Sequence, residues 1–391
     1  MRCPAAEKYE APFIIGPRVH SETMIKLTLQ YEWRPASGKG SVLDARLFEV
    51  LYAVHESGSI AAAARETGMS YRHVWGMMGA WERRLGRPLV TLKKGRGAKL
   101  TEFGRKLLWA QELVQARLAP DFDSLRHEIE SALAHGAHED APRLAICASY
   151  DLALAELRDR LARRDGLKLD LRFQGSLESL GALVREQCDL AGFHIAEGLD
   201  ERAAAQFARA LDARRHRLIG LATRTQGLVL GRGNPKEIAS LADLAWPGVR
   251  FVNRQRGSGS RLELDQLLAG AGIDPARIDG YLHEEFTHLA VAATIAGGRA
   301  DAGFGVKAAA AEYELDFLPL LTERYYLAGR SESLAALQPL LCGEELAAIL
   351  ARLPGYGNAI TGQLFEIGEA LPAARSARPV RRRAPHGTRS R

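Results

Sequence analysis

The chain has 391 residues, of which 47% are hydrophobic and 26% are charged, and its formal net charge is +6. This composition excludes a fibrous or fully disordered chain, and the length predicts at least two domains. No apolar run approaches the roughly 18 residues of a membrane-spanning helix, and the N-terminus lacks a secretory signal pattern. The four cysteines form neither a CxxC pair nor a Cys/His cluster, which argues against a disulfide framework or a zinc site. We therefore expect a cytoplasmic protein that does not bind membranes.

The positive charge is concentrated in two segments. Residues 61–110 carry a net charge of +8 and residues 371–391 a net charge of +7, whereas the rest of the chain sums to −9. A basic segment and a basic tail on an acidic remainder favour binding to a polyanion.

Composition and periodicity divide the chain into five parts. The predicted parts are a disordered extension or over-long start (1–23), a helical basic part (24–120), a polar linker (121–142), a part with alternating strands and helices (143–370) and a disordered basic tail (371–391). An alternating run at residues 25–31 predicts a strand at the start of the second part. The alternation of short apolar strands with amphipathic helices after residue 143 is typical of an α/β domain.

Three short helices are predicted between residues 42 and 85. Gly58 ends the first helix, Ser59 caps the second and Ser70 caps the third. The third helix has an apolar stripe at 3-4 spacing that predicts a buried face, formed by Tyr71, Val74, Met78, Trp81 and Leu85. Two short helices joined by a tight glycine turn, the second with basic groups on its outer side, predict a helix-turn-helix.

A basic hairpin and a long helix are predicted next. Residues 88–92 and 98–100 can pair around a Lys/Gly/Arg loop as a wing, whose cations suit DNA phosphates. Thr101 then caps a helix that is predicted to run to residue 118. An apolar seam on this helix predicts a homodimer, and the seam is formed by Phe103, Leu107, Ala110 and Val114. The residues predicted to face double-stranded DNA are Ser59, Ser70, Tyr71, Arg72, His73, Arg83, Lys93, Lys94, Arg96 and Lys99. The alternative is a three-helix bundle whose basic face is solvated and reads no DNA.

These segments resemble a known family. Residues 56–65, 68–75, 85–90 and 100–104 are similar to the DNA-binding domain of ModE-type molybdate-responsive regulators, which are distant relatives of the LysR-type regulators. The resemblance covers residues 24–118 and implies a winged-helix homodimer on a near-palindromic operator, with the Ser-Tyr-Arg element at residues 70–72 against the DNA. No duplicated small β-barrel follows the linker, so this resemblance does not supply the sensor.

Hydroxyl groups and glycines recur where strands lead into helices after residue 143. In open α/β sheets ligands bind at this edge, and helix N-termini offer unpaired N–H groups to anions. Each hydroxyl can also be an ordinary N-cap, but the Gly-Ser-Gly-Ser sequence within the arginine-rich loop 253–261 resembles an anion nest. The predicted ligand-binding residues are Ser149, Ser176, Thr225, Arg254, Ser258, Gly259, Ser260, Thr287 and His288.

The same part resembles a second family. Residues 175–194, 226–235 and 288–303 are similar to the type II periplasmic-binding-protein fold, in the cytoplasmic form that is fused to helix-turn-helix domains. The resemblance implies two lobes that close on a ligand, and relatives bind molybdate or tungstate. The arginine-rich loop also suits formate or another organic anion. The predicted architecture is thus multidomain, with an all-α winged helix-turn-helix domain followed by an α/β two-lobed domain, in a ligand-responsive transcriptional regulator.

No catalytic motif is complete in the sequence. His283 and His288 are five residues apart and would miss a common metal on a helix, and no Walker or GxSxG sequence is present. We therefore predict no enzyme, no cofactor and no protein-coordinated metal. Two alternatives stay open: a small-anion-binding protein that does not read DNA, and an enzyme, for which the available acid/base residues are His194, Glu285 and His288.

Overall fold

The computed structural model describes residues 32–34, 42–93, 97–133, 142–162, 166–198 and 201–371. The predicted extension 1–23, the strand at 25–31, the wing residues Lys94 and Arg96 and the tail after Leu371 lie outside the described residues. The chain forms two compact units, which we describe one at a time. Of the described residues, the first unit holds 142–225 and 321–371, and the second unit holds 32–133 and 226–320.

The second unit begins with a three-helix domain and a hairpin. Its elements are α1 (Ala45–Ser57), α2 (Ile60–Glu66), α3 (Tyr71–Leu85), the antiparallel strands β1 (Val90–Lys93) and β2 (Gly97–Leu100), and α4 (Glu102–Leu133). The predicted caps are confirmed, because Ser59 accepts the N–H of Ala62 and Ser70 accepts the N–H of His73. Apolar residues of all three helices and the hairpin form one core, which includes Leu47, Leu51, Ala63, Val74, Met78, Trp81, Leu89 and Leu100. The winged helix-turn-helix architecture is thereby confirmed.

The hairpin is fixed to the helices by backbone contacts. The N–H of Ala98 donates to the carbonyl of Gly58 at 2.7 Å. Gly97 has φ of +79°, and a Cβ there would lie 2.2 Å from the same carbonyl oxygen, so this position requires glycine. The Glu82 carboxylate of α3 accepts the N–H groups of Leu89 (2.7 Å) and Val90 (3.2 Å). The described strands of the wing, β1 and β2, are therefore joined to the helical domain by hydrogen bonds.

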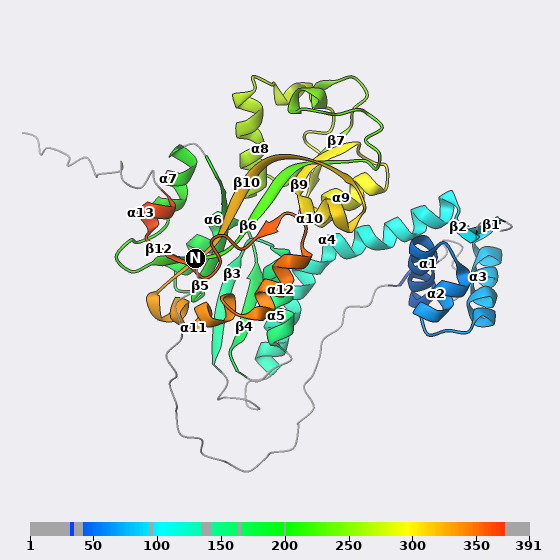
Figure 1. Ribbon diagram of the computed structural model, residues 1–391, viewed down its shortest axis with the longest axis horizontal. Coiled ribbons are helices and arrows are strands. Elements are labelled where there is room, and N and C mark those ends of the chain that lie inside the picture. Colours follow the sequence, from blue (N-terminus) through cyan, green and yellow to red (C-terminus); the bar gives the residue numbers. More distant parts are fainter. Residues whose placement is uncertain are drawn as a thin grey trace, which may run out of the picture. The chain divides into compact units, whose positions relative to one another are not determined.

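The long helix α4 extends further than predicted. It runs from Glu102 to Leu133 as one continuous helix, so the prediction of a linker from residue 121 was wrong for residues 121–133 (Figure 1). Its start is joined to the hairpin, because the Thr101 hydroxyl donates to the carbonyl of Pro88 at 2.7 Å and accepts the N–H of Gly104 at 3.0 Å.

The first unit is a sheet with a helical layer on each face. Its strands are β3 (Arg143–Ala148), β4 (Lys168–Phe173), β5 (Leu190–Ala196), parts of β6 (Arg217–Leu230) and β10 (Asp316–Gly329), and the short β11 (Tyr356–Gly357) and β12 (Leu364–Phe365). One core forms beneath α5 (Leu152–Leu161), α11 (Ser331–Leu341) and α12 (Glu344–Arg352). The other core forms beneath α6 (Ser176–Val184), α7 (Glu201–Arg209) and α13 (Ile367–Ala370).

The rest of the second unit is a smaller α/β layer. Its elements are η1 (Leu241–Ala245), β7 (Phe251–Arg254), α8 (Gly259–Gly270), η2 (Pro275–Arg277), β8 (Glu284–Glu285), α9 (His288–Ala296), β9 (Ala302–Val306) and α10 (Lys307–Glu312). The strands follow the order β4-β3-β5-β10-β6-β9-β7-β8, and β6 and β10 contribute residues to both units. The predicted α/β two-lobed architecture is confirmed. Within the described ranges no single helix is long and apolar enough to cross a membrane, and only α11 and α12 together, which meet at 66°, meet that criterion.

Candidate nucleic-acid interface and ligand site

The outer face of α3 carries the predicted polar and basic groups. Arg72, His73 and Arg83 are exposed, whereas Val74 and Met78 on the opposite side are buried in the domain core. The cap at Ser70 fixes where the helix begins and so fixes the direction of its first turn. This arrangement allows α3 to enter a groove of a duplex with three polar side chains directed outward.

Tyr71 does not belong to the buried stripe, contrary to the prediction. Its side chain is 54% exposed, and it stacks on Trp75, which is 45% exposed. Tyr71 lies at the edge of the apolar stripe and at the first helical turn, where its neighbour at i+4 is this second aromatic ring. The sequence spacing could have revealed the pair, because positions 71 and 75 share one face of the helix.

The wing adds cations to the same domain. Lys99 is exposed on β2, and Lys93 ends β1. Two further arginines, which the sequence analysis did not single out, are held on aromatic rings: the Arg84 guanidinium lies 4.8 Å from the ring centroid of Trp81, and that of Arg87 lies 5.4 Å from that of Phe103.

The predicted ligand residue Ser149 lies in a buried polar network of the first unit. Its hydroxyl oxygen is 3.1 Å from Nδ1 of His194 and donates to the hydroxyl of Tyr325 at 3.2 Å. The hydroxyl of Tyr325 in turn donates to the carbonyl of Ser149 at 2.6 Å, and burial raises the pKa of Tyr325 far above its usual value, so the phenol is neutral. Ser149 thus has protein partners at the end of β3.

A buried arginine next to this network binds two carboxylates. Arg224, which is 1% exposed, donates to Asp151 at 2.9 Å and pairs with Glu323. Asp151 also accepts from the hydroxyl of Tyr356 at 2.9 Å and caps α5. This cluster could not be predicted from the sequence, because its members lie on distant segments and no local pattern brings them together.

Ser176 is the predicted hydroxyl with a different environment. It is the first residue of α6 and is 3% exposed, and its hydroxyl has no hydrogen-bond partner among the described residues. The N-cap Gly175 has no side chain to satisfy the first N–H groups of the helix. A buried hydroxyl next to uncapped N–H groups is the donor set that binds a small anion. Thr225, at the end of the same unit's β6 segment, is half-buried and its N–H donates to the carbonyl of Gly355.

In the second unit the start of α8 is already capped. The Ser258 hydroxyl accepts the N–H of Arg261 at 3.2 Å. Ser260, one residue beyond Gly259, accepts from the Gln226 amide at 3.2 Å and lies 3.5 Å from Nε2 of His288. The buried Glu263 carboxylate accepts from the same amide at 3.0 Å. These side chains form a buried polar layer on the second unit.

The arginines of loop 253–261 have partners within the protein. Arg254 donates to the carbonyl of Phe286 at 2.9 Å and to the side chain of Gln255. Arg261 donates to Asp265 at 3.1 Å and lies over the ring of Tyr281. In this structure these arginines therefore hold the loop in place.

Thr287 has a role that the sequence analysis did not foresee. Its hydroxyl accepts the N–H of Ala290 as the cap of α9 and donates its proton to the carbonyl of Ala116 in α4 at 3.0 Å. The geometry does not support the predicted role as a ligand residue, because the single hydroxyl proton is already donated. His288, the next residue, is buried at the start of α9.

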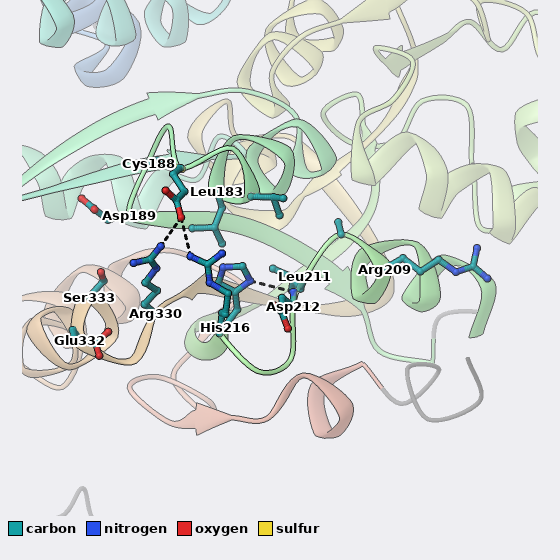
Figure 2. A pocket seen from close by; sticks show the side chains of 14 residues that line it. Leu183, Cys188, Asp189, Arg209, Leu211, Asp212, His216, Arg330, Glu332 and Ser333 are labelled. Carbon is teal, nitrogen blue, oxygen red and sulfur yellow. Dashed lines mark hydrogen bonds and ion pairs between the residues drawn. The ribbon is translucent and has the colours of Figure 1, made fainter. Parts of the chain in front are cut away.

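A separate cavity of about 710 Å³ lies on the first unit and contains none of the predicted ligand residues. Figure 2 shows His216 and Arg330 in its wall, and the N–H of Asp212 donates to the His216 ring at 3.2 Å. Burial, with help from Arg215, lowers the pKa of His216. Arg215 and Arg330 both donate to Glu186, which balances part of their charge.

Comparison with known proteins finds a matching family for one segment in each of the two main parts of the chain. Residues 45–105 match the family described as bacterial regulatory helix-turn-helix protein, lysR family, and residues 158–341 match the PBP superfamily domain. The chain is 34% identical over 198 residues to the uncharacterized protein YvgK of Bacillus subtilis. These aligned residues cover 50% of this chain and 64% of YvgK. The chain thus spans less than two thirds of that relative.

Two further similarities are more limited. The molybdenum-pterin-binding protein MopB of Rhodobacter capsulatus is 39% identical over 84 residues, which cover 20% of this chain and 31% of MopB. The solved structure of the full-length LTTR LysG from Corynebacterium glutamicum with the bound effector Arg is 17% identical, covers 78% of this chain and 98% of its own, and has a TM-score of 0.37.

Proposed function

We propose that this chain, whose helix-turn-helix domain matches the LysR family and whose later part matches a PBP superfamily domain, is a transcriptional regulator that binds operator DNA in response to a small ligand. The observation that carries the DNA-binding part is the outer face of α3, where Arg72, His73 and Arg83 are exposed in a domain that also holds the hairpin β1–β2. Such a regulator acts in the cytoplasm, and the proposal assigns it binding functions only, with no reaction and no cofactor.

We propose that the regulator is a homodimer joined through α4. Beyond the predicted seam, Leu118 and Leu125 lie seven residues apart on the same helix and are 41% and 52% exposed. Exposed leucines at heptad spacing on a long helix are typical of a coiled-coil contact. A two-fold dimer would place two copies of α3 on a near-palindromic operator.

The DNA-binding part is tested by fluorescence anisotropy with operator-sized duplexes. Substituting Arg72→Ala removes an exposed cation from the first turn of α3 and should weaken binding by about 1–3 kcal/mol. The matched control is Arg277→Ala, an exposed arginine on η2 far along the chain. Equal loss in both variants, or no loss in either, would contradict the assignment of α3 as the DNA-reading helix.

We further propose that the ligand is a small anion bound at the start of α6 in the first unit. The support is the buried, unpartnered hydroxyl of Ser176 beside the uncapped N–H groups after Gly175. The start of α8 supports an anion less strongly, since Ser258 already caps it. Neutral hydroxyl and N–H donors suit a molybdate- or tungstate-like oxyanion, and MopB is named as a molybdenum-pterin-binding protein. Formate or another organic anion is the alternative.

The ligand proposal is tested by calorimetry and thermal shift with molybdate, tungstate, sulfate, phosphate and formate. Binding to the native state raises the melting temperature by mass action. Ser176→Ala should lose most of the shift, whereas Ser331→Ala should keep it, because Ser331 is also the first residue of a helix without a side-chain cap but is exposed. If Arg254→Ala loses binding and Ser176→Ala does not, the anion binds at loop 253–261 instead.

A further inference from the structure

Within the second unit, a buried carboxylate joins α4 to the strand before α9. Arg117 of α4 donates to both oxygens of Glu285, with Nε at 2.9 Å and Nη2 at 2.5 Å. The Glu285 side chain is 1% exposed, and it also accepts from the Thr294 hydroxyl at 2.8 Å. A buried carboxylate needs such partners, so α4 is a required neighbour of β8 and α9.

Thr287 completes a hydrogen bond that α4 cannot make itself. Pro120 has no backbone N–H, so it cannot donate to the carbonyl of Ala116 four residues earlier in the helix. The Thr287 hydroxyl donates to this carbonyl instead, at 3.0 Å, and is 3% exposed. A carbonyl that an interior proline leaves unpaired is thus satisfied by a residue 171 positions further along the chain.

Small residues let the two helices approach closely. The indole N–H of Trp109 in α4 donates to the carbonyl of Ala293 in α9, and a Cβ at Gly297 would lie 2.1 Å from the indole nitrogen. Leu113, Ala116, Ala290 and Ala293 form a common buried cluster. The contact of α4 with β8 and α9 therefore combines three polar interactions, Arg117–Glu285, Thr287–Ala116 and Trp109–Ala293, with a tightly packed apolar face.

The short segment formed by residues 285–287 also bonds to loop 253–261. The N–H of Gln255 donates to the carbonyl of Glu285 at 3.1 Å, and Arg254 donates to the carbonyl of Phe286 at 2.9 Å. Strands β7 and β8 pair in parallel with Arg254 opposite Glu285. Glu285 and Phe286 therefore contact the loop through their backbone carbonyls, and Glu285 and Thr287 contact α4 through their side chains.

The other end of α4 is built into the helix-turn-helix domain. A Cβ at Gly104 would lie 2.3 Å from the carbonyl oxygen of Leu89, and the Thr101 hydroxyl bonds to Pro88, so helix and wing are in direct contact. One continuous helix connects this contact with Arg117.

We propose that residues 285–287 form the contact through which loop 253–261 and the DNA-binding domain influence each other, with Arg117 and Thr287 as its positioning residues. This proposal rests on the proposed function, because it requires that α3 and the wing bind DNA. Coupling between two sites is reciprocal, so DNA binding must change the stability of α9 even when no ligand is present.

Hydrogen exchange of the full chain, with and without a random-sequence duplex at low salt, tests this without knowledge of the ligand. In the wild type, duplex binding should slow exchange in α3 and, several-fold, in residues 285–297 and 253–261. Thr287→Val should retain the slowing in α3 and lose it in α9, and Thr287→Ser, which keeps the hydroxyl, should restore it. Arg117→Gln should behave like Thr287→Val.

A double-mutant cycle separates this contact from the cap that Thr287 also provides. Pro120→Ala supplies the N–H that the Ala116 carbonyl lacks, so Thr287→Val should uncouple α9 less in that background. If the duplex slows exchange nowhere in the wild type, the proposed function is wrong. If it slows α3 but leaves residues 285–297 unchanged in the wild type, or if Thr287→Val folds and responds like the wild type, the coupling proposal is overturned.

Discussion

Tyr71 and Trp75 stack on the outer face of α3 with their ring planes 5° apart and their centroids 6.4 Å apart. Two exposed aromatic rings next to Arg72 and Gly76 give the helix an apolar contact surface within a polar one. Such surfaces meet thymine methyl groups or sugar edges in a duplex groove.

Trp75→Ala should therefore weaken duplex binding by about 1–3 kcal/mol. Trp246 provides a matched control, because it is 48% exposed but lies near η1. Trp246→Ala should leave the affinity unchanged. Retained affinity in Trp75→Ala would mean that the aromatic pair faces another partner.

The dimer contact is best probed beyond the seam that the sequence predicts. Leu107 packs partly against the core of the helix-turn-helix domain, so its substitution would also disturb folding. The double substitution Leu118→Glu with Leu125→Glu places charge on the exposed part of α4 instead, and light scattering should then report monomers. Leu282→Glu, at a leucine that is 69% exposed near β8, should remain dimeric. A dimeric double variant would show that α4 does not hold the dimer together.

Gly97 tests the attachment of the wing. Gly97→Ala combines a positive φ with a Cβ 2.2 Å from the Gly58 carbonyl, whereas Gly68→Ala, at φ of +67°, meets nothing within 4 Å. Both alanines have the cost of a positive φ, and only the alanine at position 97 also has the steric clash. Gly97→Ala should therefore destabilise the domain by about 1–3 kcal/mol more than Gly68→Ala. Urea unfolding followed by circular dichroism measures the difference. Equal losses would show that the hairpin shifts without cost.

Local chemistry explains what the sequence predicts well. Ser59 and Ser70 begin helices because their hydroxyls accept an N–H three residues later, and Gly58 ends α1 because its φ is +63°. Each of these interactions involves residues within one turn, so the boundaries can be located without knowing the fold. The α/β alternation of the later part is recognisable for the same reason.

Long-range partners explain what the sequence does not predict. The residues next to Thr287 in the sequence do not show whether its hydroxyl only caps α9 or also donates to the carbonyl of Ala116. That second bond depends on the fold, which brings α4 beside α9. The ion cluster of Arg224 likewise joins residues 73 and 99 positions away, Asp151 and Glu323. The predicted end of α4 at residue 118 was wrong, because the helix continues through Pro120, and Thr287 bonds to the Ala116 carbonyl that the proline cannot reach with an N–H.

The stability of the second unit is expected to depend on pH through Glu112 of α4. It is half-buried in a region lined by acidic side chains, and burial, followed by Glu312 and Glu56, raises its pKa from the usual 4.5 to about 7. The other titratable groups that line the adjoining cavity are Tyr52, His55, Arg105, Arg232, Tyr313 and Glu314. The folded protein therefore binds a proton at Glu112 that the unfolded chain has released between about pH 4.5 and 7.

The sign of the pH effect follows from this proton. Since the folded state binds more protons than the unfolded state in this window, stability should fall as pH rises from about 4.5 to 7 and level off above it. Glu112→Gln removes the titration, so the difference in urea midpoint between variant and wild type should grow across the same window in favour of the variant. Glu344→Gln on α12 of the first unit is the control and should follow the wild type. A difference that is independent of pH would mean that Glu112 titrates normally and that Glu56 and Glu312 lie too far from it to matter.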